Sequence, residues 1–251
     1  MSEQEESPAG RAASDGIPSS ELPGTPSPAP PWAEVEPRDP GVLQILAVEH
    51  SGLLSARSLV YNESFARVAS FLTLVSMSFV GLALVAQARG FDRDFLVLAG
   101  IAMVFDLLVG LATIARVLSA IDEDLRALLG MSRLRHAYLE VAPYLRPYFT
   151  TPVNDDVRSV LTSYSEAQVG VAAVVYFFST SVGLMVLIVS VLAGLATGVG
   201  VSAAGGAVGL AVVAGVAIGL TSFLGLALLA RRSILAGQAA IESRFPSPQN
   251  E

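Results

Sequence analysis

The stretch FLVLAGIAMVFDLLVGLATIA, from Phe95 to Ala115, decides the fold class of this chain. It is 21 residues long. At about 1.5 Å per helical residue it crosses a bilayer core of roughly 30 Å. One carboxylate, Asp106, lies near its centre, where an acidic side chain costs roughly 2.5–3.5 kcal/mol on insertion scales. The stretch therefore predicts a membrane-spanning helix, and Asp106 is its most informative residue.

Three further apolar blocks have a similar length, at residues 68–88, about 169–195 and about 207–230. The whole chain is 53% hydrophobic and only 15% charged, whereas about 25% of the residues in a soluble domain are charged. The sequence therefore predicts an all-α membrane protein, a bundle of four transmembrane helices surrounded by lipid.

Composition excludes several kinds of site. The chain has no cysteine, so disulfides, thiolate metal sites and cysteine nucleophiles are absent. Its formal net charge is −7, and residues 1–40 contribute −6 of this, with eight acids against two arginines. The remainder is close to neutral. Since nucleic-acid binding requires a basic face, we expect no nucleic-acid partner.

The segments between the spans have distinct compositions. Residues 1–38 are rich in Pro, Ser and Glu, which predicts a disordered acidic tail. Residues 39–67 precede the first span and favour a helix that lies on the membrane surface or extends that span. Residues 39–116 then form a first hairpin unit and 169–232 a second. Residues 117–168 form a helical connecting segment, and residues 233–251 a C-terminal tail.

The arginines indicate the orientation, because positive charge accumulates on the cytoplasmic side. The connecting segment is rich in arginine, whereas the turn between the last two spans has no charge. Both termini and the connecting segment are therefore predicted to be cytoplasmic.

Local signals divide the connecting segment. The second helix can continue past the membrane to Leu129, where Gly130 is a plausible C-cap. A short helix can follow, and Asn154 or Asp155 can cap a later helix that leads into the third span.

The two hairpins share short similarities that favour an internal duplication. The sequence YNES at 61–64 parallels YSEA at 164–167, and GLATIAR at 110–116 parallels GLALLAR at 225–231. Both hairpins enter from the same side, so the repeat would be parallel. Asp106 would then correspond to Thr221. Chance similarity between apolar helices remains the alternative.

Asp106 shares a helix face with small or polar residues, among them Thr113, so this face is predicted to pack inward. The predicted spans contain no Arg or His that could neutralise the acid. We expect it to be protonated and hydrogen-bonded to hydroxyls of neighbouring helices, with Ser78 and Thr221 among the candidates. Three interpretations stay open: a neutral contact that assembles the bundle, a proton- or cation-handling group, and a position that faces another subunit.

The fourth helix is predicted to carry small residues at four-residue spacing. This pattern is typical of close helix packing, inside the bundle or between protomers. The members are Ala203, Ala207, Ala211, Gly215 and Gly219.

Arginines beside tyrosines suit a lipid-headgroup interface. The candidates are Arg133, Arg135, Arg146, Arg231 and Arg232. The two histidines, His50 and His136, are interpreted as solvated or interfacial. We find no catalytic or nucleotide-binding motif, and we predict neither a cofactor nor a metal site.

The segments LGMSRLRHAYLE at 129–140 and ARSLVYNE at 56–63 resemble those of integral membrane proteins of actinobacteria that have no established activity. The resemblance covers roughly residues 45–165. It implies a bacterial plasma membrane protein and identifies no site. Together the observations favour a non-enzymatic structural, interaction or regulatory membrane protein, with a possible homo-oligomer or an unknown protein partner. A small proton-linked transporter or channel subunit that uses Asp106 is the alternative.

Overall fold

The computed structural model describes residues 40–164, 177–178 and 180–247, all of which belong to one unit of the chain. Four long helices dominate it: α1 (Pro40–Arg89), α2 (Arg93–Val141), α5 (Ser181–Ala203) and α6 (Val208–Ala239). Each of them is long and apolar enough to cross a membrane. The prediction of an all-α, four-span membrane bundle is therefore confirmed, and the chain is a multi-pass membrane protein. The predicted tail at 1–38 lies outside the described residues.

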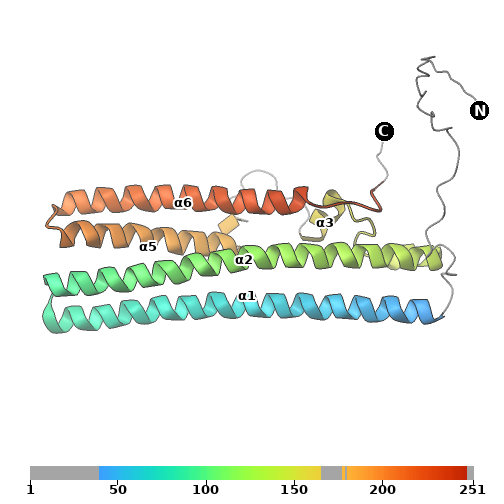
Figure 1. The fold of residues 1–251 in the computed structure, drawn as a ribbon, viewed down its shortest axis with the longest axis horizontal. Helices are drawn as coiled ribbons and strands as arrows, with labels where there is room; N and C mark the ends of the chain where they lie inside the picture. Colours follow the sequence, from blue (N-terminus) through green and yellow to red (C-terminus); the bar gives the residue numbers. More distant parts are fainter. Residues whose placement is uncertain (1–39, 165–176, 179, 248–251) are drawn as a thin grey trace, which may run out of the picture. The chain divides into compact units, whose positions relative to one another are not determined.

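The four helices pack in a simple order (Figure 1). α1 contacts α2, α2 contacts α5, and α5 contacts α6, so α5 lies between α2 and α6. The main apolar core forms where α1, α2 and α5 meet, around Phe71, Ile114, Met185 and Val189. Most other apolar side chains on these helices face outward, as expected for a protein surrounded by lipid.

Each hairpin turns at a glycine with positive φ, which other residues rarely adopt. Gly90 (φ 77°) joins α1 to α2, and Gly205 (φ 82°) joins α5 to α6. Asp92 caps α2 by accepting a hydrogen bond from the Phe95 amide at 2.8 Å. Thr180 caps α5 by accepting one from the Gly183 amide at 3.1 Å. Local turn and cap chemistry therefore fixes where α1 ends, where α2 and α5 begin, and where α5 turns toward α6.

α1 and α2 continue far beyond the predicted spans. Residues 40–67 extend the first span as part of one helix rather than forming a separate surface element. The predicted C-cap at Gly130 is wrong, because α2 runs through it to Val141. A Cβ at Gly130 would lie 2.9 Å from Leu53 Cδ1, so this glycine leaves room for α1. We call the paired parts of α1 and α2 beyond the predicted spans, residues 40–67 and 117–141, the stem.

A 3₁₀ helix, η2 (Pro143–Tyr148), and a short helix, α3 (Val157–Tyr164), follow the stem. The residue that caps α3 is Asp156, not the predicted Asn154 or Asp155: its carboxylate accepts from the Ser159 amide at 3.2 Å. A second apolar cluster in this region contains Leu125, Leu128, Met131 and Val160.

The second hairpin differs from the prediction at its boundaries. The described helix α5 begins at Ser181 and continues past the predicted end at Leu195 to Ala203. The N-terminal part of the predicted third span, 169–176, lies outside the described residues. Ala203 therefore ends α5, and Ala207 is the N-cap of α6, so neither lies on the fourth helix as predicted. α6 extends into the predicted tail, as far as Ala239.

Candidate functional site

Asp106 is buried inside the first hairpin, with 1% of its surface exposed. The hydroxyl of Ser78 on α1 donates to Asp106 Oδ1 at 3.0 Å. Gly110, one turn further along α2, faces the same side: a Cβ there would lie 2.6 Å from Val189 Cγ2 and 2.9 Å from Phe71 Cζ. The acid is therefore held in a tightly packed position, where Ser78 is its hydroxyl partner among the described residues.

The two threonines singled out with Asp106 do not join this pair. Thr113 is buried on α2, but its hydroxyl donates to the Val109 carbonyl of its own helix at 2.8 Å. Thr221 is exposed on α6, and its hydroxyl donates to the Ala217 carbonyl at 2.9 Å. Neither side chain supplies a second polar group to Asp106.

At the stem end of the first hairpin, one arginine links α1 to α2. Arg116 binds Glu63 on α1, with Nη2 to Oε2 at 2.9 Å, and Glu123 on α2, with Nη1 to Oε1 at 2.7 Å. Glu63 also accepts from Arg67 at 3.0 Å. These side chains are partly exposed, so solvent screens each pair and its own contribution to stability is small. Their main effect is to fix how the two helices align.

A second polar contact lies further along the stem. Arg57 Nε lies 2.5 Å from Asp124 Oδ1, and the Tyr61 hydroxyl donates to Asp124 Oδ2 at 3.4 Å. Only 5% of the Asp124 side chain is exposed. A buried carboxylate without partners is costly, so Arg57 and Tyr61 allow this acid to face α1.

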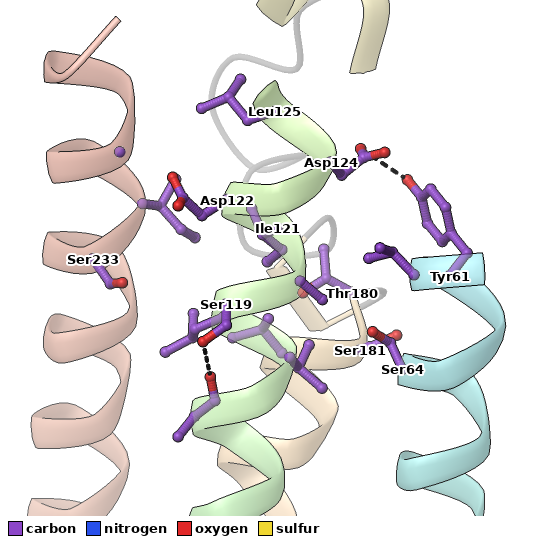
Figure 2. Close-up of a pocket in the computed structure, with 18 of the residues that line it drawn as sticks. Tyr61, Ser64, Ser119, Ile121, Asp122, Asp124, Leu125, Thr180, Ser181 and Ser233 are labelled. Carbon is purple, nitrogen blue, oxygen red and sulfur yellow. Dashed lines mark hydrogen bonds between the residues drawn. The ribbon is translucent and has the colours of Figure 1, made fainter. Parts of the chain in front are cut away.

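A cavity of about 1070 Å³ lies beside these contacts (Figure 2). Its walls come from α1, α2, α6 and the residues around the start of α5, and most are apolar. Hydroxyl groups also line it, from Ser64, Ser119, Thr180, Ser181 and Ser233. The carboxylates that line it are paired, Asp122 with Arg126 and Asp124 with Arg57. The part of the lining that the structure describes therefore suits an apolar group with a few hydroxyl contacts, and it presents no unpaired carboxylate to a cation.

The strongest polar centre in the described structure is one that the sequence analysis missed. Asp155 is fully buried. Its carboxylate accepts from the Ser243 hydroxyl at 2.7 Å, the Arg244 amide at 3.0 Å and the Phe245 amide at 2.7 Å. Arg133 Nε lies 2.8 Å away. Asp155 therefore ties the segment after α6 to α2.

Burial of the Asp155 carboxylate opposes its ionisation. The Arg244 amide, the Arg133 guanidinium and the Phe245 amide outweigh this effect and hold the pKa of Asp155 well below its usual range. Asp156 is similar: burial opposes its ionisation, but Ser247 and Ser159 donate to it and lower its pKa.

We call this centre the tail clamp and define it as Asp155, Asp156, Arg133 and residues 242–247. Two further contacts support it. Asn154 Nδ2 donates to Ser247 Oγ at 2.9 Å. His136 stacks on Phe245 with ring centroids 4.1 Å apart. The sequence predicts Asp155 only as a possible helix cap, because the tail that satisfies its carboxylate is distant in the chain.

The arginines proposed for lipid headgroups divide into two groups. Arg133 belongs to the tail clamp, where Nη2 also donates to the Glu242 carbonyl at 2.8 Å, so these donors are used inside the protein. Arg135 donates to the Pro152 carbonyl at 3.5 Å. The other three, Arg146, Arg231 and Arg232, are exposed.

Ala211, Gly215 and Gly219, the members of the predicted stripe that lie on α6, face α5. Ala211 and Gly215 are buried. A Cβ at Gly215 would lie 2.8 Å from the Gly194 carbonyl oxygen, and one at Gly219 would lie 3.3 Å from the Ser190 carbonyl oxygen. This part of the stripe therefore packs backbone against backbone inside the protomer.

The described residues contain no group of three or more His, Cys, Asp or Glu side chains that could hold a metal ion. His50 is stacked with Tyr138 at 6.0 Å, and His136 is used in the tail clamp. Comparison with protein-family models, curated proteins and solved structures found no match. The functional interpretation therefore depends on the geometry of this chain.

Proposed function

We propose that this chain is a non-enzymatic interaction or regulatory protein of a bacterial plasma membrane, and that its stem binds a protein partner. One observation carries the proposal. Large apolar side chains are exposed on α1 within the stem: Ile45 is 70% exposed, Val48 64% and Leu59 68%. A helix of 50 residues is roughly 75 Å long, more than twice the thickness of a bilayer core. Lipid therefore cannot cover all of α1.

The polar groups support the same proposal. Arg116, Asp124 and Asp155 join one element of the chain to another. Such contacts stabilise a scaffold and leave these groups few donors or acceptors for a substrate. The interaction would take place on the cytoplasmic side, because the arginine-rich segments are retained there.

A photo-crosslinking amino acid at Leu59 tests the proposal in intact membranes. We expect a discrete adduct with a protein. The matched control is the same amino acid at Val213, which is 67% exposed on α6 and within a predicted span, where we expect adducts with lipid alone. The absence of protein adducts at both positions would contradict the proposal.

The alternative, a small proton-linked transporter or channel subunit, is supported by the burial of Asp106 within a span. Proton and cation flux in liposomes decides between the two functions, with wild type compared with Asp106→Asn at matched folded yield. We expect no flux in either. Flux in wild type that disappears in Asp106→Asn would make Asp106 a coupling residue and would replace our proposal.

A further inference from the structure

The side of α1 that faces away from α2 carries almost no charge. α1 uses the opposite side for its contacts with α2, through Leu53 against Gly130, Arg57 to Asp124, Phe71 against Gly110 and Ser78 to Asp106. In the stem, the charged residues of α1 lie on the side that contacts α2 or on the flanks of that side. Water-exposed helix faces usually carry charged side chains at about a quarter to a third of positions. An uncharged face is therefore unusual outside the membrane.

The exposed residues on this side follow a heptad pattern, with alternating spacings of three and four. We call them the outer face of α1. They are Ile45, Val48, Gly52, Ser55, Leu59, Asn62, Ala66, Ala69, Thr73, Ser76, Val80 and Ala83, all of them exposed and none charged. This 3.5-residue period is the one at which two helices remain in contact by supercoiling about each other.

The outer face continues without interruption from the stem into the first predicted span. Its central members are small or carry hydroxyls, as in helix contacts within membranes. Gly52 is also unexplained by the packing of the protomer, since a Cβ there would meet nothing within 4 Å. Glycine inside a helix is about 1 kcal/mol less favourable than alanine, so close approach by a second helix gives this residue a purpose.

The geometry of a membrane restricts the possible partner. A helix that follows this face along its whole length must cross the membrane and continue well beyond it. α1 of a second copy does both at the same depth and in the same direction, so a two-fold axis normal to the membrane brings the two outer faces together in register.

The area of the outer face and the charges on its flanks are also compatible with a dimer. The outer face spans about 57 Å, and a helix is about 10 Å wide. A symmetric pair would bury roughly 1,200 Å² in total, the lower limit of a stable interface. Residues that would meet across the flanks are Gln44 with Glu49, and Ser58 with Glu63, so no like charges oppose each other.

We propose that two copies of this chain form a parallel dimer through the outer face of α1. The inference rests on the proposed function, because it names the partner of the stem. Asn62 lies on this face and its side chain is exposed in the protomer. In the dimer, its amide would bond to the same amide of the second copy. A polar residue at a core position fixes register and oligomeric state.

Single-cysteine variants test the dimer directly, because the chain has no cysteine of its own. A disulfide requires Cα atoms within about 7 Å. In oxidised membranes that contain the full chain, we expect Leu59→Cys and Ala66→Cys to give several-fold more disulfide-linked dimer than Leu54→Cys. Leu54 is the matched control, since it is 49% exposed on the stem but lies off the outer face.

A second variant separates assembly from folding. Leu59→Glu places two carboxylates against each other at the axis and is expected to convert the dimer to monomer, measured by light scattering of the purified protein. Its helical circular dichroism is expected to match wild type, because Leu59 is exposed in the protomer. Leu54→Glu is the control and is expected to remain dimeric.

Several outcomes would overturn the dimer. One is a monomeric wild type without cross-links at Leu59→Cys. Another is a monomeric protein in which deletion of residues 1–38 makes Leu59→Cys reactive toward a maleimide. That result would mean that residues 1–38 cover the outer face in the full chain. A monomer that still gives photo-adducts with a different protein at Leu59 would also reject the dimer, but the proposed function would stand.

Discussion

The two membrane hairpins are held together by different chemistry. In the first, side chains connect α1 to α2: Ser78 bonds Asp106, and Arg116 bonds Glu63. In the second, backbones make the contact, and a Cβ at Gly194 would lie 2.7 Å from the Gly215 carbonyl oxygen. The α5–α6 contacts described by the structure include no side-chain hydrogen bond between these two helices.

The difference shows two ways to join helices inside a membrane. Apolar side chains alone give little driving force there, because the lipid is equally apolar. Hydrogen bonds across a membrane interface contribute about 0.6 kcal/mol on average, and each can be removed separately. Close backbone packing depends instead on the absence of side chains, so a single added group separates the helices along their length. The second hairpin should therefore tolerate fewer substitutions at its interface than the first.

The largest expected effect is at Gly215. Gly215→Leu places a side chain against the Gly194 backbone, which cannot move aside as a flexible side chain could. We expect a loss of about 3 kcal/mol in the free energy of unfolding, measured by denaturant titration in detergent. Gly225→Leu is the control, because a Cβ there meets nothing within 4 Å. Equal stability of both variants would refute the backbone-packing account.

The next largest effect is expected at the tail clamp, which holds the segment after α6 against α2. Asp155→Ala removes the acceptor for the Arg244 and Phe245 amides and leaves Arg133 without its carboxylate. We expect residues 242–247 to lose about 2 kcal/mol of docking free energy, seen as faster hydrogen exchange at these two amides. Asp94→Ala serves as control, because Asp94 is exposed in the first turn of α2, at the other end of that helix from Arg133. Unchanged protection in Asp155→Ala would mean that other contacts hold the tail.

A smaller effect is expected at the polar pair of the first hairpin. Ser78→Ala and Asp106→Ala should each lower the free energy of unfolding. The double variant should show a coupling of about 0.6 kcal/mol, because either change removes the one hydrogen bond that the two side chains share. A coupling near zero would show that the pair does not join the helices.

The smallest effect is that of mild acid on the tail clamp. The folded-state pKa of Asp155 lies below that of the unfolded chain. Its carboxylate therefore stabilises docking at every pH above its ordinary pKa of about 3.9, and this stabilisation is lost as the pH falls below that value. Exchange protection at Phe245, corrected for intrinsic rates, should be constant between pH 8 and about pH 5. A midpoint inside that range in a His136→Phe background, which removes the imidazole stacked on Phe245, would contradict the contacts described for Asp155.

Much of the fold could be predicted because it depends on local features. Apolar length identified all four spans, and the small residues around Asp106 predicted the face that the structure buries. Gly130 misled the prediction because a glycine that ends an isolated helix can also make room for a neighbouring one. The contact with Leu53 on α1, which decided between these outcomes, is distant in the sequence.

The tail clamp was missed for the same reason. Asp155 and Ser243 are almost ninety residues apart, and no local pattern relates a buried carboxylate to backbone amides in a distant loop. The α5–α6 turn shows a different limit. The segment from Leu195 to Ala203 is rich in glycine and small residues, which favours a loop in water. Tight packing against α6 keeps it helical here.

Because α1 is one unbroken helix, any change in its length also rotates one end of the helix relative to the other. Each residue in this 50-residue helix adds about 1.5 Å and about 100°, and no joint absorbs the rotation. One residue inserted near Gly52 would turn the N-terminal end of the stem by more than a quarter turn relative to the membrane, although no contact in the spans would change. Seven inserted residues would nearly restore the original phase. The stem can therefore be lengthened or shortened only in steps of about two turns if its two ends are to keep facing the same direction.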